Sequence, residues 1–176
     1  MPALTNTAIL RQILTSDGLL FTTENTEPTN GAPELTSLGF SDSEGVSWSM
    51  IVLSYSNAAL LRFYSYIGPD ILLLPRQRIL DLINEINWRL LFESHLDLVP
   101  GLPGIRFKAG FRGVGIGLPT YEAREAIQLH VTRSTYLHNL LKVAIRNNEM
   151  DPGRAISQSY ERALSLSGLT EAPIFL

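Results

Sequence analysis

Cysteine is absent from the 176 residues of this chain, which excludes disulfides, thiolate metal sites and cysteine nucleophiles. Histidine is scarce, with three residues, and charged residues make up only 18% of the sequence. The formal net charge of −3 provides neither the basic footprint of a nucleic-acid-binding domain nor an acidic tail. Apolar residues, at 45%, are sufficient for a hydrophobic core, and the length favours one domain.

Long apolar runs are missing too. The longest, residues 71–74, is far short of the roughly 20 residues that cross a bilayer. Residues 1–14 lack the basic segment and apolar stretch of a signal peptide. We therefore expect no membrane association, and a cytoplasmic location fits the lack of cysteine.

Motifs for cofactor chemistry are not found either. His130 and His138 are eight residues apart, over two helical turns, so one ion cannot easily bridge them, and we interpret them as polar or half-buried helix positions. The glycine-rich stretch from Gly113 fails the G-x-G-x-x-G pattern because its sixth position is Leu118. The sequence predicts no catalytic residue, no metal and no cofactor.

Helical spacing of apolar residues predicts four helices, over residues 6–15, 76–92, 120–147 and 152–167. Thr5 or Asn6 can cap the first helix and Thr120 the third, while Pro152 suits the first position of the fourth. The second helix has an apolar stripe for docking on a sheet. A second stripe on the same helix predicts a dimer or loop contact through Leu80, Asn84, Asn87 and Leu91.

Alternating patterns predict strands over residues 19–22, 46–54, 59–67, 96–99, 105–111 and 114–118. The second and third of these form an antiparallel hairpin, because only a short turn joins them. Residues 23–33, rich in Thr, Asn, Glu, Pro and Gly, are interpreted as a mobile loop. This order predicts an α+β fold, an antiparallel sheet with helices packed mainly on one face.

The sheet face opposite the helices is expected to be polar in such a fold. Here that face carries apolar and aromatic residues beside arginine, a mixture typical of binding surfaces. The alternative is that the fourth helix or the C-terminal tail covers it. The predicted protein-binding residues are Ile51, Leu53, Leu60, Arg62, Tyr64 and Tyr66.

Residues 79–89, with the sequence ILDLINEINWR, followed by Leu-Asp-Leu at 96–98, resemble the YbjN family. The resemblance covers about residues 5–147 and matches the family's N-x-x-N pair to Asn84 and Asn87, for which it implies a structural role. It divides the chain into a YbjN-like domain, 1–150, and a C-terminal helix with an apolar tail, 151–176. It also implies a fold like that of type III secretion chaperones, which are usually homodimers that bind segments of other proteins without catalysis.

Three functions follow as hypotheses. The first is a non-catalytic, chaperone-like adaptor that binds a partner protein along the sheet face or at a sheet edge. The second is association with nucleic acid, based on the row Arg106, Lys108 and Arg112. The third is a small-molecule enzyme whose pocket unites distant residues such as His95, Glu122 and Tyr136.

Overall fold

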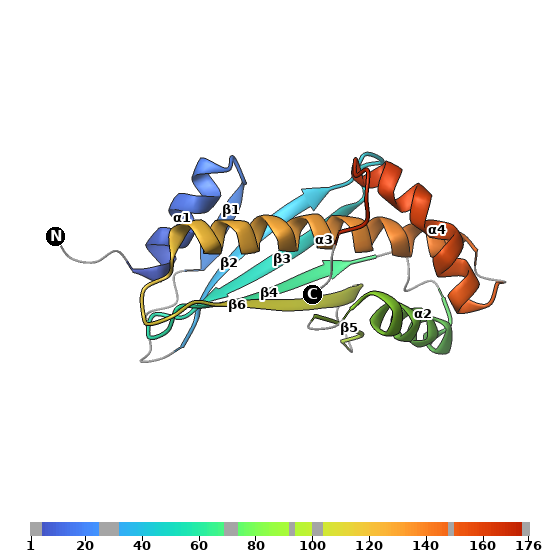
Figure 1. The fold of residues 1–176 in the computed structure, drawn as a ribbon, viewed down its shortest axis with the longest axis horizontal. Coiled ribbons are helices and arrows are strands. Elements are labelled where there is room, and N and C mark those ends of the chain that lie inside the picture. The colour runs from blue at the N-terminus through green and yellow to red at the C-terminus, as the bar shows by residue number, and fades with distance from the viewer. Residues whose placement is uncertain are drawn as a thin grey trace.

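The computed structural model confirms the α+β prediction: its described residues form a six-stranded antiparallel sheet and four helices (Figure 1). The order of the strands is β1-β2-β3-β4-β6-β5. The structure describes residues 5–24, 32–68, 74–91, 94–99, 104–147 and 150–173. No helix within these ranges has the length and apolar character needed to cross a bilayer.

The strands are β1 (Phe21–Glu24), β2 (Glu34–Ser41), β3 (Ser47–Ser54), β4 (Leu60–Ile67), β5 (His95–Asp97) and β6 (Ile105–Arg112). The β3–β4 hairpin forms as predicted, with Ile51 opposite Tyr64. β6 then lies between β4 and β5, because the chain leaves the sheet after β4 to form a helix and returns at the edge.

The helices are α1 (Asn6–Ser16), α2 (Arg76–Leu90), α3 (Thr120–Arg146) and α4 (Pro152–Ser167). The Thr5 hydroxyl caps α1 by accepting a hydrogen bond from the Ala8 N–H at 3.2 Å. The prediction that Thr120 caps α3 was wrong. Pro119 occupies the cap position with extended backbone angles, and Thr120 is the first helical residue.

One face of the sheet is covered by helices. The long helix α3 crosses it, and α1 and α4 lie on the same side, whereas α2 packs beside β5 at the sheet edge (Figure 1). Of the two elements that we considered as covers for the opposite face, α4 packs instead on α3 and α2. The end of the tail, residues 174–176, lies outside the described residues.

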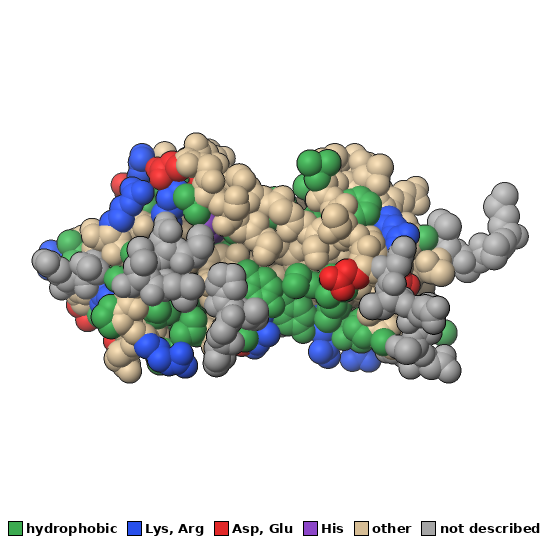
Figure 2. Space-filling model, turned by 180° about the vertical axis from the view of Figure 1, so that it is seen from behind, with side chains coloured by type: hydrophobic (Ala, Val, Ile, Leu, Met, Phe, Trp, Pro, Cys, Tyr) green, Lys and Arg blue, Asp and Glu red, His purple; other side chains and the backbone are tan. Residues whose placement is uncertain are grey.

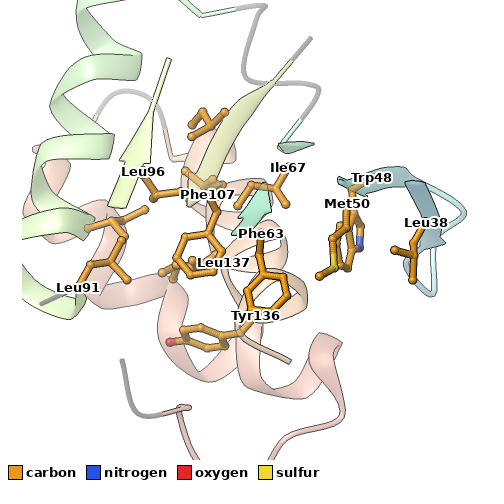
Figure 3. Packing of buried hydrophobic residues seen from close by; sticks show 14 of the residues in the cluster. Leu38, Trp48, Met50, Phe63, Ile67, Leu91, Leu96, Phe107, Tyr136 and Leu137 are labelled. Atoms are coloured by element: carbon orange, nitrogen blue, oxygen red, sulfur yellow. The ribbon is translucent and has the colours of Figure 1, made fainter. Parts of the chain in front are cut away.

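The core lies between the sheet and α3. Alternate side chains of β3 and β4 point into it, including Met50 and Phe63, and α3 contributes Tyr136 and Leu137 (Figure 3). α4 adds Ala155, Ile156 and Ala163 to the same cluster. This packing fixes which side chains of each strand point away from the helices.

Two segments differ from the prediction. Residues 114–118 are not a strand, because Gly115 has φ +86°, and Val114 and Ile116 are 99% and 69% exposed. The predicted loop 23–33 was too long. Its first two residues belong to β1, and the unpredicted strand β2 starts at Glu34, while residues 25–31 lie outside the described part of the chain.

Candidate protein-binding surface

The sheet face turned away from α3 is called the outer face here. All six residues predicted to bind protein lie on it, alternating with the core-facing positions of β3 and β4. Arg62 is exposed and the other five are partly exposed. Figure 2 shows this face, with hydrophobic side chains gathered near the middle and Lys and Arg side chains along the lower edge.

The apolar centre of the outer face is a continuous patch made by Leu35, Ile51, Leu53, Tyr64 and Tyr66. Strand pairing places Leu35 opposite Leu53 and Ile51 opposite Tyr64, so these residues are cross-strand neighbours on three adjacent strands. Together with Arg106 they line a shallow hollow of about 220 Å³. Leu35 was missed in the sequence because β2 was not recognised.

A second, larger hollow of about 460 Å³ adjoins the apolar centre over β4 and β6. Its lining includes three cationic side chains, Arg62, Lys108 and Arg112, together with Gly110 and the exposed His95 of β5. Lys108, Gly110 and Arg112 are each two residues apart along β6, so all three face the same side of the sheet. The outer face is therefore apolar over β2, β3 and the Tyr64–Tyr66 part of β4, and cationic at Arg62 of β4 and along β6.

Asp97 of β5 organises part of this charge. Its carboxylate accepts two hydrogen bonds from Arg106, at 2.9 and 2.8 Å, and lies 2.7 Å from the Lys108 Nζ. Burial raises the pKa of Asp97, but the hydrogen bonds from both cations outweigh it and keep the pKa below its usual value. Two members of the row predicted to contact nucleic acid are thus already paired with a carboxylate.

The four residues of the second stripe of α2 have different surroundings. Asn87 faces β5, where its side chain forms two hydrogen bonds with the backbone of Leu96. Leu91 is buried and Leu80 partly buried, whereas Asn84 is exposed. The neighbouring Trp88, which the sequence prediction did not single out, is 85% exposed.

The residues suggested for an enzyme pocket are not brought together. Tyr136 is fully buried in the core beneath α3, while His95 lies on the outer face of the sheet. Glu122 is exposed in the first turn of α3. The sheet therefore separates the histidine from the tyrosine.

His130 and His138 are more deeply buried than predicted, at 2% and 1% exposure. His130 forms a 3.0 Å hydrogen bond with Ser65, which also accepts one from Ser134 at 2.9 Å. Burial lowers the pKa of His130 to about 3, so its ring is neutral at pH 7. Because Ser65 and Ser134 are fully buried, a substrate in solution cannot reach this serine–histidine contact.

No protein-family model matches the chain, and neither does any curated protein or solved structure. The resemblance to the YbjN family stays a prediction.

Proposed function

We propose that this chain is a non-catalytic, chaperone-like adaptor that holds a segment of a partner protein on its outer face. The observation that carries the proposal is the apolar centre on a sheet face that α1, α3 and α4 leave uncovered. An antiparallel sheet with one solvated face ordinarily carries polar side chains there. A cluster of leucine, isoleucine and tyrosine in that position is typical of a surface that binds another protein.

The kinds of residue on the outer face support the same proposal. Tyrosine and arginine are enriched at the centres of protein interfaces, since they combine a large contact area with hydrogen-bonding groups. Here Tyr64 is stacked beneath a cation, with the Arg106 guanidinium carbon 5.6 Å from the ring centroid. Because the ion pairs with Asp97 hold Arg106 in place, this part of the surface is ordered before a partner arrives.

The core behind the outer face supports rigid docking. The outer residues of β3 and β4 alternate with buried ones, as Leu53 does between Val52 and Ser54, which are at most 1% exposed. A partner segment that binds here requires little rearrangement of the sheet, since the strands are already packed against α3.

The proposed adaptor acts as a homodimer, with α2 as the contact between copies. Support comes from Trp88, whose large indole is almost fully exposed beside Asn84 on the helix surface. A second copy of α2 packed on this side would remove the indole from water, which favours association. Light scattering of the wild type and of Trp88→Ala tests this part, with a dimer expected for the first and a monomer for the second.

The main test is affinity capture from a native lysate with mass spectrometry of the eluate. The bait proteins are the wild type and the double variant Leu53→Asp/Tyr64→Asp, which places two negative charges in the apolar centre. We expect one dominant, near-stoichiometric partner on the wild type and its loss from the double variant. A matched control is Leu129→Glu, since Leu129 is 43% exposed on α3, on the other side of the sheet.

The control and the double variant must both keep the thermal transition of the wild type. A partner that stays bound to Leu53→Asp/Tyr64→Asp, or that is lost only with Leu129→Glu, contradicts the proposal.

A further inference from the structure

The geometry points to a receptor for acidic side chains at the cationic end of the outer face. We define the Gly110 notch as the space above Gly110 that is bounded by Arg62, Lys108 and Arg112. The inference rests on the proposed function and specifies the partner's chemistry: an extended segment with apolar side chains followed by aspartate or glutamate.

The notch follows from strand register. Gly110 of β6 is directly opposite Arg62 of β4, and Lys108 and Arg112 lie two residues away on either side along β6. All four positions face outward, so three long cationic side chains surround one position that has no side chain. With strands about 4.8 Å apart and about 6.7 Å between alternate residues, Arg62 and Arg112 can both reach a single carboxylate above Gly110. Lys108, which is paired with Asp97, borders the notch on its other side.

Charge in the notch is incompletely neutralised. Arg62 and Arg112 take part in no ion pair with the described residues, and the Arg62 guanidinium instead lies 5.8 Å from the Tyr55 ring. Asp97 is shared between Arg106 and Lys108, so one carboxylate serves two cations. This local excess of positive charge belongs to a chain whose formal net charge is −3, and it favours an anionic ligand at this place.

One row of paired residues, which runs across the strands of the sheet, determines the orientation of the bound ligand. Paired positions run from Glu24 on β1 through Leu35, Leu53 and Arg62 to Gly110 on β6. One end of this row is acidic, the middle is apolar and the other end is cationic. An acidic side chain is therefore repelled at β1 and attracted at β6, whereas apolar side chains fit between them.

A protein segment fits this pattern better than a nucleic acid does. A phosphate backbone needs a track of cations that follows its repeating charge. The outer face offers a cationic end confined to β4 and β6, next to apolar side chains that would remain unpaired with phosphates. An acidic and apolar peptide occupies both parts at once.

The test is fluorescence anisotropy with a labelled peptide of about ten residues that carries two leucines followed by two glutamates at alternate positions, separated by serines. Its partner probe has glutamines in place of the glutamates. We expect the glutamate peptide to bind the wild type about tenfold more tightly than the glutamine peptide at low salt, and the difference to shrink at about 0.5 M NaCl.

Protein variants test whether the preference for glutamate arises at the Gly110 notch. Arg62→Gln/Arg112→Gln should abolish the preference for glutamate, while Arg154→Gln, which removes a charge from an exposed position on α4, should keep it. Gly110→Ala should also weaken binding of the glutamate peptide, because a side chain then enters the notch without removing a cation. Alanine is the smallest such change, since a Cβ at this position lies 3.3 Å from the Leu61 carbonyl oxygen. Thermal unfolding of each variant checks that the sheet is intact.

Several outcomes overturn the inference. Equal binding of both peptides, with loss of both in Leu53→Asp/Tyr64→Asp, leaves the proposed function standing and removes the acidic receptor. Tighter binding of a single-stranded oligonucleotide of similar length than of the glutamate peptide contradicts the choice of ligand. Failure of both peptides and the oligonucleotide to bind at low salt removes the receptor altogether.

Discussion

Asn87 of α2 and Leu96 of β5 are joined by two hydrogen bonds: the Asn87 Nδ2 donates to the Leu96 carbonyl at 3.0 Å, and the Leu96 N–H donates to the Asn87 Oδ1 at 2.9 Å. The amide side chain thus pairs with the backbone as a neighbouring strand would. β5 is a three-residue edge strand bonded to β6 on its other side, so this contact ties α2 to the edge of the sheet.

Replacing Asn87 with alanine should destabilise the fold by about 1–3 kcal/mol, because the N–H and C=O of the buried Leu96 lose their partners. Urea denaturation at pH 7 measures the difference. Asn84→Ala is the matched control on the same helix, since Asn84 is exposed, and it should change stability by no more than about 0.5 kcal/mol. Equal losses in the two variants would refute the structural role assigned to Asn87 alone.

His130 should make the stability of the fold depend on pH in the mildly acidic range. Its pKa is about 3 in the folded chain, because the ring is buried between the rings of Phe63 and Phe107 and faces the charge of Arg133, against an ordinary value of 6.5. Below pH 6.5 the unfolded chain therefore binds a proton that the folded chain excludes. Between this value and the folded pKa of about 3, each pH unit should cost about 1.4 kcal/mol of stability through this group.

His130→Gln tests that dependence, since glutamine can still form a hydrogen bond with Ser65 but does not titrate. The free energy of unfolding of the wild type should fall by about 2 kcal/mol more between pH 7 and pH 5 than that of the variant. Parallel pH profiles for the two proteins would show that folding does not change the pKa of His130, which contradicts the burial of its ring.

Asp42 should stabilise the fold above about pH 4. It lies in the turn between β2 and β3, accepts hydrogen bonds from the Glu44 and Val46 N–H groups at 2.8 Å, and forms an ion pair with the buried Lys142 of α3. Burial raises its pKa, but these hydrogen bonds outweigh burial and lower the pKa to about 2.

Because the folded pKa is lowered, the contribution of Asp42 is present above the unfolded pKa of 3.8 and is lost as the pH falls towards 2. Asp42→Asn should cost at least about 2 kcal/mol at pH 7, since Lys142 also loses a charged partner. Chemical denaturation from pH 7 to pH 2.5 should show this deficit shrinking only below about pH 4. A deficit that is constant over the whole range would contradict the lowered pKa.

The alternation of residues in two strands was enough to predict the outer face. Trp48, Met50 and Val52 alternate with Ser49, Ile51 and Leu53, and a strand has only two faces, so identifying one face defines the other. The helical stripe at α2 was equally clear. Ile79, Leu82, Ile83 and Ile86 are all buried as their spacing predicts.

The strand β2 was not predicted because its residues, taken one by one, are poor indicators of β-structure. Thr36, Leu38 and Phe40 alternate with Leu35, Ser37 and Gly39, but serine and glycine are common in turns, and the preceding segment is rich in proline and glycine. At residues 114–118 the error is the opposite one, a strand that was predicted but does not form. Val114, Ile116 and Leu118 alternate as in a strand. The Leu118 N–H instead donates a hydrogen bond to the Asn6 side chain, 112 residues away in sequence, and such a contact leaves no local pattern.

The Gly110 notch could not be predicted from sequence because it depends on pairing between strands that are distant in the chain. The row of Arg106, Lys108 and Arg112 was visible in β6, but Arg62 joins it only through the register of β4 against β6. Likewise, the pairing of Arg106 and Lys108 with Asp97 requires β5 to occupy the edge.

The most direct test of the central claim is site-specific photo-crosslinking in lysate. A benzophenone amino acid is introduced at Tyr64, in the apolar centre of the outer face, and in a second protein at Leu129, on α3. If the outer face binds the partner, one dominant covalent adduct with a partner protein forms from position 64 and none from position 129. Adducts that form from position 129, or from neither position while the partner is still captured, would place the binding surface elsewhere and contradict the proposed function.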